Sequence, residues 1–334
     1  MERFATHAGS WYPSNTETLT KQLTTSRTLP HTTPNCRVII SPHAGYKYCA
    51  RTMLPAYHSL DIKTDHSIKI FILGPSHHIY FKNKVLISGF NEVDTPLGKL
   101  SIDTDLAKEW TTQHPDLFKY MDPEVDMEEH SLEMQFSILY NTLRQRGITN
   151  IQAEVKIIPI MISHGESNMF SKLGQIIGDQ LYKDPYTYMI ISSDFCHWGR
   201  RFEYTGYVGS RDDLKDAMDE ETEIEMLTSR SKLSHHQIPI WSSIEILDRY
   251  AMDILNLNDP DMWNKYLDIT GNTICGRMAL ECLLYVIKYL TEQHDINCKW
   301  GWNKYSQSSQ VQSVGESSVS YSSGHVQLNV NKSK

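Results

Sequence analysis

Four short apolar runs lie in the first two hundred residues, at residues 36–41, 67–73, 154–163 and 186–193. They read CRVIIS, SIKIFIL, EVKIIPIMIS and YTYMIISS, and each is nearly continuous in apolar character rather than alternating. That pattern is typical of strands buried on both faces of a sheet. We therefore predict four buried strands.

Segments with helical spacing separate these runs. Leu132, Phe136, Leu139 and Leu143 follow one another at intervals of four, three and four, and a similar spacing runs from Leu173 to Leu181. Two later helices are predicted at residues 243–256 and 276–291. Strands that alternate with helices predict an α/β fold, with a largely parallel central sheet flanked by helices.

The chain is predicted to form a single domain over residues 1–334, because no Pro- or Ser-rich linker divides its middle. Low complexity occurs only near the end, in SQSSQVQSVGESSVSYSSG and the final polar residues. We expect this polar C-terminal end to be flexible.

A histidine follows each predicted strand: His43, His77, His164 and His197. Ligands of open α/β sheets bind in the crevice beyond the carboxyl ends of the strands. We therefore predict that His43 and His77 share one site there. His164 is expected only to end its strand, and His78 lies either behind the site or in ordinary packing.

Asp194 and His197 lie three residues apart after the fourth strand. A carboxylate can orient a neighbouring imidazole and raise its basicity, which suits a general acid or base. The alternative is a helix-capping aspartate followed by a packed histidine. We favour the first interpretation, with Asp194 in the pocket.

The segment MEEHSLEMQF, residues 127–136, places His130 and Glu133 on one helical face. This spacing can serve a metal site, but it also fits an ordinary acidic helix start. We place His130 near the pocket, give Glu133 less weight, and expect Glu128 and Glu129 to be solvated.

Cys275 precedes an apolar helix in the segment GNTICGRMALECLLYVIKYL. A helix N-terminus favours a thiolate, and hence a metal ligand or nucleophile. A small buried residue is an equally good interpretation of the same residues.

Composition limits the classes of function. The net charge of −8 and the lack of a basic block argue against a nucleic-acid partner. The N-terminal segment MERFATHAGSWYP has no apolar stretch long enough for a signal peptide. A run of about 18 consecutive apolar residues, as a membrane span needs, occurs nowhere. The six cysteines form no CxxC pair and fit free thiols in a reducing compartment. We expect a cytoplasmic protein that is also found in the nucleus.

Seven segments resemble one family, the Memo family (mediator of ErbB2-driven cell motility), and the chain looks like a fungal member. The segments are HAGSWYP (7–13), PHAGYKYC (42–49), FILGPSHH (71–78), EEHSLEMQ (128–135), SSDFCHWGRRF (192–202), NTICGR (272–277) and SSVSY (317–321).

The resemblance implies a fold related to the class III extradiol dioxygenases, in which two histidines and a carboxylate hold non-haem iron. Carried over, His43 and His77 match the histidine ligands, and His197 matches the acid/base histidine. Cys275 stands where a carboxylate would be, so dioxygenase activity does not follow. The resemblance implies copper or iron in preference to zinc, and a role in redox signalling and cell motility or growth.

Three functions are therefore carried forward. The first is a metal-dependent redox protein, an oxidoreductase if it turns over a substrate. The second is a non-catalytic signalling adaptor, whose inherited pocket binds a protein, peptide or small ligand. The third is a zinc-dependent hydrolase, since two histidines, a cysteine and a water make a plausible catalytic zinc set.

Overall fold

A computed structural model describes residues 1–24, 32–232, 234 and 236–330. The chain divides into two compact units, which are described separately. The sheet unit comprises Met1–Ser193, Gly276–Lys304 and the chain from Ser323 on, and the insertion unit comprises Asp194–Cys275 and Tyr305–Ser322. That the whole chain acts as a single domain stays a prediction.

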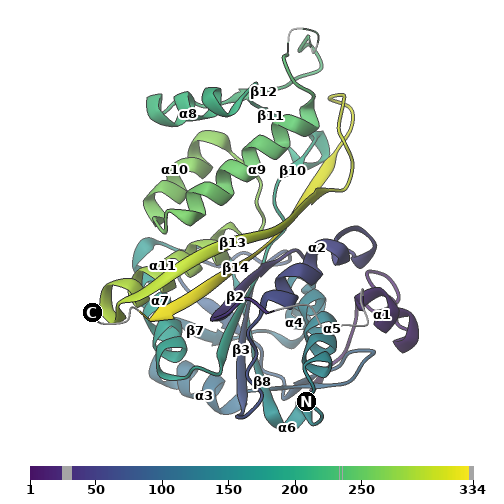
Figure 1. Cartoon of the computed structure of the whole chain (residues 1–334), viewed down its shortest axis with the longest axis vertical. Coiled ribbons are helices and arrows are strands. Elements are labelled where there is room, and N and C mark those ends of the chain that lie inside the picture. The colour runs from purple at the N-terminus through teal and green to yellow at the C-terminus, as the bar shows by residue number, and fades with distance from the viewer. Residues whose placement is uncertain (25–31, 233, 235, 331–334) are drawn as a thin grey trace. The chain divides into compact units, whose positions relative to one another are not determined.

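A largely parallel sheet forms the centre of the sheet unit (Figure 1). Its four central strands are β8 (Val155–Ile162), β3 (Ile68–Pro75), β9 (Thr187–Ser192) and β2 (Cys36–Ser41), in that order across the sheet. Each pairs in parallel with the next. These are the four predicted strands, and nearly all their residues are buried, as expected for strands covered on both faces.

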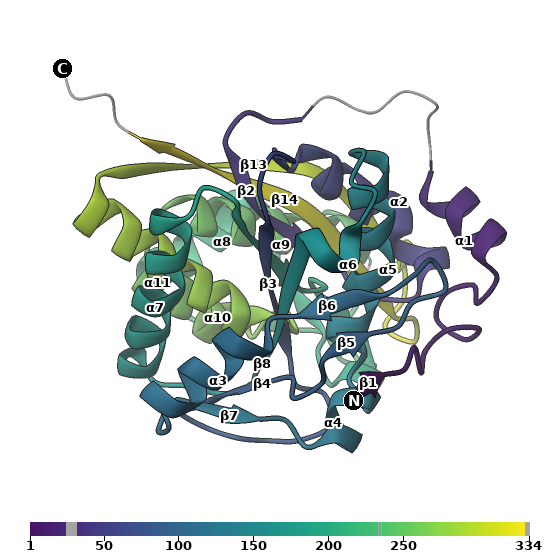
Figure 2. The same ribbon diagram turned by 90° about the horizontal axis from the view of Figure 1, so that it is seen from below.

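Helices cover both faces of this sheet (Figure 2). On one side lie α7 (Ser167–Lys183) and α11 (Arg277–His294), which pack against each other, and on the other lie α2 (Tyr46–Ser59) and α5 (His130–Gln145). All the predicted helical segments are helical. The α/β fold with a mostly parallel central sheet is confirmed.

Shorter elements complete the sheet unit. The strands are β1 (Glu2–Arg3), β4 (Val85–Ile87), β5 (Glu92–Val93), β6 (Leu100–Ile102) and β7 (Phe118–Tyr120). The helices are α1 (Thr16–Leu23), α3 (Thr104–Gln113), α4 (Pro123–Glu128) and α6 (Ile151–Glu154).

The insertion unit is mainly helical. Its helices are α8 (Arg211–Glu220), α9 (Ile240–Asn256) and α10 (Pro260–Thr270), with a 3-10 turn at Arg200–Phe202. Its short strands are β10 (His197–Trp198), β11 (Gly206–Tyr207) and β12 (Glu225–Met226). Its core is formed by apolar side chains around the fully buried Trp198 and Ile244.

Two long strands, β13 (Ile296–Gln307) and β14 (Ser318–Val330), pair with each other and close the chain. In the sheet unit, Gly324 to Gln327 of β14 run antiparallel to β2. In the insertion unit, Ser318 and Val319 pair with β10. Much of the serine-rich stretch is therefore an ordered strand. The last four residues, on which the expectation of flexibility also rests, lie outside the described residues.

The chain leaves the sheet unit after Ser193 and returns at Gly276. Within the sheet unit these two positions touch, since the Gly276 amide donates a hydrogen bond to Ser193 Oγ (3.0 Å). A Cβ atom on Gly276 would lie 2.4 Å from Ser193 Cβ and 2.7 Å from the Ser192 carbonyl oxygen. Only glycine fits this close approach.

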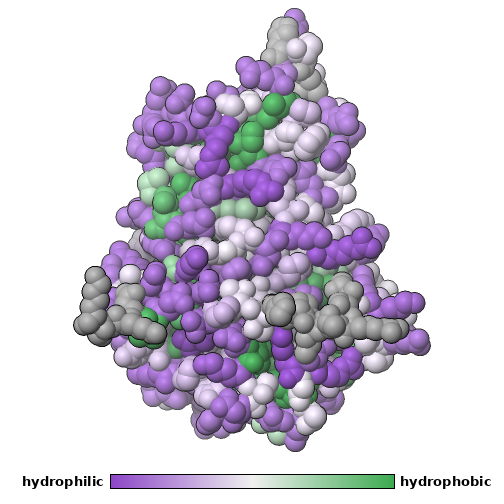
Figure 3. Space-filling model, viewed as in Figure 1, coloured by the Kyte–Doolittle hydropathy of each residue, from purple (hydrophilic) through white to green (hydrophobic). Residues whose placement is uncertain are grey.

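Hydrophilic side chains make up most of the face seen in Figure 3, and hydrophobic ones appear there in small separate patches. Among the described residues, no helix has the length and apolar character needed to cross a membrane.

Candidate functional site

His43 follows β2 and is buried, with 2% of its surface exposed. Its Nδ1 atom lies 2.9 Å from the hydroxyl oxygen of Ser192, the last residue of β9. That hydroxyl donates its one proton to the Ser131 carbonyl (2.6 Å) and accepts a hydrogen bond from Gln135 Nε2 (2.9 Å).

These contacts determine the tautomer of His43. A hydroxyl has one proton to donate and two lone pairs, and here the proton is already committed to a carbonyl. His43 Nδ1 must therefore be the donor in its contact with Ser192. In the neutral ring this leaves the lone pair on Nε2, which is the form of histidine that binds a metal.

His77 follows β3 and is held in the same way by a carboxylate. Its Nδ1 lies 2.8 Å from Glu129 Oε1, and its backbone amide donates to Glu129 Oε2 (2.7 Å). A carboxylate only accepts, so His77 also carries a proton on Nδ1, and in the neutral ring this leaves the lone pair on Nε2. A histidine whose second nitrogen donates to a carboxylate is a recurring feature of metal sites.

Glu129 was expected to be solvated, and this expectation is wrong. Its side chain is fully buried, and it also caps α5 by accepting from the Ser131 amide (2.9 Å). Burial by itself would raise the pKa of the carboxyl, but the hydrogen bond and charge of His77 outweigh burial and lower the pKa to about 2. Glu129 therefore stays ionised against the His77 ring.

The structure brings His43 and His77 together. Their ring centroids are 5.3 Å apart, and one ring nitrogen of each lies within 4.8 Å of the other. Metal–nitrogen bonds of about 2.0–2.1 Å can bridge such a pair with a small adjustment of the side chains. The two histidines thus offer two lone pairs to one position.

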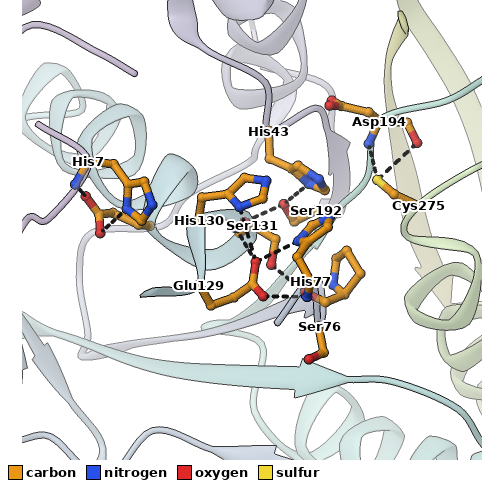
Figure 4. A network of polar contacts seen from close by, with 12 residues as sticks. His7, His43, Ser76, His77, Glu129, His130, Ser131, Ser192, Asp194 and Cys275 are labelled. Carbon is orange, nitrogen blue, oxygen red and sulfur yellow. Dashed lines mark hydrogen bonds and ion pairs between the residues drawn. The ribbon is translucent and has the colours of Figure 1, made fainter. Parts of the chain in front are cut away.

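His130, at the start of α5, lies against both of these rings (Figure 4). It stacks on His77 with centroids 4.2 Å apart, and its centroid is 5.5 Å from that of His43. Burial and the neighbouring His77 lower the His130 pKa to about 3, which keeps its ring neutral. His77, Glu129 and His130 form a second group whose ligand atoms lie within 4.8 Å of one another.

A further histidine, His7, lies beside His130 and was not predicted there. Its Nδ1 lies 3.0 Å from Glu133 Oε2, and its ring centroid is 6.0 Å from that of His130. Burial opposes ionisation of Glu133, but His7 and Arg3 outweigh it and lower the Glu133 pKa to about 2. The signal was the tripeptide His-Ala-Gly, which occurs at both His7 and His43. His78, by contrast, is exposed.

In the insertion unit, Cys275 lies against the backbone of Asp194. The Asp194 amide donates a hydrogen bond to Cys275 Sγ (3.2 Å), and Sγ lies 3.6 Å from the Asp194 carbonyl oxygen (Figure 4). Cys275 is partly exposed, whereas the other five cysteines are buried. The shorter contact, in which the amide donates to sulfur, favours the thiolate, as does the start of α11 two residues further on, whereas the longer contact, in which the thiol donates to the carbonyl, favours the protonated form.

His197 is oriented by backbone carbonyls. Its Nδ1 lies 2.9 Å from the Phe195 oxygen and 3.1 Å from the Thr273 oxygen, so Nδ1 carries the proton and Nε2 the lone pair. Asp194 takes part in neither of these hydrogen bonds, and its predicted role in orienting His197 stays a prediction.

Buried Asp248 ties together the two segments that carry His197 and Cys275. It accepts hydrogen bonds from the Cys196 amide (3.2 Å), the Asn272 side chain (3.1 Å) and the Tyr305 hydroxyl (2.9 Å). Burial raises the pKa of this carboxyl to about 6. Sequence reasoning missed Asp248, because nothing local distinguishes it from other acidic residues of an amphipathic helix.

The fold and these groups define an α/β protein with histidine clusters that could hold a metal ion near the carboxyl ends of its parallel strands. Comparison with known proteins gives the family. The profile of the Memo-like protein family matches residues 3–325, and the chain belongs to this family. The resemblance seen in the seven segments is confirmed.

Relatives match over nearly the whole chain. The MEMO1 family protein MHO1 of Saccharomyces cerevisiae is 51% identical over 98% of this chain and 99% of its own. A MEMO1 family protein of Schizosaccharomyces pombe is 38% identical over 96% and 97%, and the mouse Protein MEMO1 is 33% identical over 96% of each. These matches support a fungal member of the family.

Among solved structures, an uncharacterized protein of Escherichia coli aligns with 85% of this chain and 99% of its own. The sequence identity is 11% and the TM-score 0.41, a likeness too distant to bear on function.

Proposed function

We propose that this protein binds copper or iron through His43, His77 and Cys275 and acts in redox chemistry linked to signalling. The observation that carries the proposal is the pair His43 and His77. Each is fixed with its proton on Nδ1 and its lone pair on Nε2, and ring nitrogens of the pair lie within 4.8 Å. A pair fixed in this way is arranged for a metal ion.

Covalent connectivity supports Cys275 as the third ligand. Cys275 is bonded to Gly276, whose amide donates to Ser193, and Ser193 follows the serine that holds His43. Adjacent Cα atoms are about 3.8 Å apart, so the hydrogen bond of Gly276 also keeps the backbone of Cys275 close to the end of β9, where Ser192 contacts His43. The sulfur would add a soft ligand, which favours Cu(I) over harder ions.

When bound, copper or iron would supply one-electron redox chemistry. The residues of the chain do the rest. Ionised Glu129 holds the His77 proton on Nδ1, and neutral His130 stacks against the His77 ring and helps to fix its orientation. His197, oriented by two carbonyls, offers Nε2 to accept or return a proton.

The cellular role that we propose is in signalling and in cell motility or growth, in the cytoplasm and also in the nucleus. Protein MEMO1 of mouse and MHO1 of yeast carry the family name alone, so these roles rest on family membership. A protein or peptide partner and a small-molecule substrate are both compatible with the proposal.

Element analysis of protein purified without added metal, combined with spectroscopy of the bound ion, tests the proposal. We expect close to one copper or iron per chain, and oxygen consumption that a chelator abolishes. The matched control is the double variant His43→Ala/His77→Ala, which should contain none. Metal-free native protein that still binds its partner would favour the adaptor, and one zinc with hydrolytic activity would favour the hydrolase.

A further inference from the structure

A pocket of about 740 Å³ with a basic lining lies in the sheet unit, among residues of α1, α2 and β13. We call it the basic pocket and define it by five lining side chains: Lys21, Lys47, Arg51, His58 and Lys304. Among the described residues that line it, none is a carboxylate. None of the five belongs to the histidine groups of the candidate metal site.

Within the part of the chain that the structure describes, the positive charges of the basic pocket lack acidic partners. Among the described residues, no carboxylate oxygen lies within 4.0 Å of the charged nitrogens of Lys21, Arg51 or Lys304. Elsewhere on this chain cations are often paired, as Lys99 is with Glu92 at 2.7 Å. Four like charges around one hollow are unfavourable by themselves, and in a chain of net charge −8 they are not a general excess.

A partly buried cation, Arg146, reinforces the wall of the pocket. Arg146 donates a hydrogen bond from Nη2 to the carbonyl oxygen of His58 (2.8 Å). Burial and the positive charge of Arg146 lower the pKa of His58. Burial lowers the pKa of Arg146, and the charge of Asp61, which does not line the pocket, only opposes this effect. The side chains around His58 thus present mainly positive charge to it.

Apolar side chains form the rest of the lining. Ala50 and Leu54 are buried on α2, and Pro55 lies beside them within the same helix. A volume of about 740 Å³ is typical of pockets that hold small organic molecules. The basic pocket therefore combines a charged rim with a surface on which an organic body can pack.

We propose that the basic pocket binds a small anion with two or more phosphate groups, either free or as the headgroup of a lipid. Several cations from separate elements match several negative charges close together, and both lysine and arginine donate strong hydrogen bonds to phosphate oxygens. A single carboxylate would leave most of this charge unmatched.

Calorimetric titration of the full-length, metal-free protein with tripolyphosphate and with ATP tests the proposal. The metal must be removed first, because polyphosphates bind metal ions themselves. Vesicles of phosphatidylcholine, with and without a phosphatidylinositol bisphosphate, form the second arm and identify the source of the phosphates. We expect saturable binding of at least one of these probes that weakens as salt is added.

The variant Lys21→Gln/Lys304→Gln should weaken binding about tenfold or more, since each lost cation removes a charge-assisted contact. The matched control is Lys119→Gln/Lys172→Gln, which removes two exposed lysines outside the pocket and should bind like the wild type. Nuclear magnetic resonance of His58 provides an independent readout, because a bound anion should raise its pKa. Equal affinities in the two double variants, no saturable binding, or an unmoved His58 would each overturn the proposal.

Discussion

His77 of the sheet unit and His197 of the insertion unit are held in different ways. In the sheet unit, His77 donates to an ionised carboxylate, Glu129, whose pKa is lowered to about 2. In the insertion unit, His197 donates to two neutral carbonyls, and the nearby buried carboxylate of Asp248 binds backbone and side-chain donors and has its pKa raised to about 6.

This difference suits the two histidines to different roles. A carboxylate beside the ring makes it a better metal ligand by increasing its basicity, and keeps its orientation fixed. Neutral carbonyls fix the orientation without placing a negative charge beside the ring, which suits a group that must both take up and release a proton. The comparison supports our proposal that His77 binds the metal and that His197 transfers protons.

The largest expected effect tests the comparison of His77 with His197 directly. His77→Ala should abolish metal binding, because it removes one of two paired ring nitrogens. His197→Ala should leave metal stoichiometry nearly unchanged and depress any redox turnover by about 10²-fold. Element analysis and turnover of both variants check this prediction. Loss of metal in His197→Ala would show that the two histidines do not divide the work.

Cys275→Ser should give the next largest effect. Serine keeps the size of cysteine but supplies a hard oxygen that is normally protonated, so Cu(I) affinity should fall far more than Fe(II) affinity, by about 10²-fold or more. Titration against a competing chelator measures both affinities, with thermal melts to exclude unfolding.

The control for this prediction is Cys298→Ser, at a cysteine on β13 whose thiol pKa is raised to about 12 by burial. The affinity of Cys298→Ser for Cu(I) should equal that of the wild type. In the metal-free protein, Cys275 should also oxidise before buried Cys282. Equal Cu(I) affinity in Cys275→Ser and the wild type would remove Cys275 from the site.

Glu129→Gln should weaken metal binding by about 10–100-fold, the usual effect of losing a partner that orients a metal-binding histidine. Glu133→Gln, one turn along α5, breaks a similar contact to His7 and should leave the affinity unchanged. Both substitutions alter buried charges, so each variant needs a folding control by circular dichroism. Equal losses of affinity in the two variants would place His7 in the metal site as well.

The last expected effect is on stability in acid. In the metal-free protein, His130 has a pKa of about 3 against an ordinary value of 6.5, and Glu129 about 2 against 4.5. Below each ordinary value the unfolded chain binds a proton that the folded chain does not, so stability falls as the pH falls. We expect Glu129 to contribute a loss of about 3 kcal/mol as the pH falls from 4.5 towards 2.

Urea denaturation across this pH range checks the prediction. His130→Gln should remove the part of the loss that begins near pH 6.5, whereas Glu129→Gln should remove the part below pH 4.5. Asp248, whose pKa is raised, acts in the opposite direction between its ordinary value of 3.8 and about 6. Asp248 is present in the wild type and in both variants, so its contribution cancels when their pH profiles are compared. Unchanged pH profiles in both variants would contradict the assignment.

The apolar runs predicted the four central strands to within two residues at each end, because strands buried on both faces need almost unbroken apolar sequence. The helices were predicted because their apolar residues recur at helical spacing. Strand β14 was not, because its buried positions are filled by serines, among them Ser320, Ser322 and Ser323. Composition alone reads such a segment as polar.

The candidate site was predicted as far as chain order allows. His43 and His77 were placed together because parallel strands end at one edge of a sheet. Glu129 was misjudged, because its partner His77 is 52 residues away and an acidic pair before a helix normally faces water. The site of Asp248 depends on four segments meeting in space, which no local pattern predicts.

The order in which the chain is synthesised gives β14 a particular importance. Strand β2 leads directly to His43 and lies between β9 and β14. A growing chain can pair β2 with β9 once residue 192 has been made, but the other edge of β2 stays open until residues 324–327 arrive. An open apolar edge invites pairing with other chains. A chain that lacks β14 therefore leaves one edge of β2, the strand before His43, unpaired. The sheet around this histidine is complete only after β14 has been made.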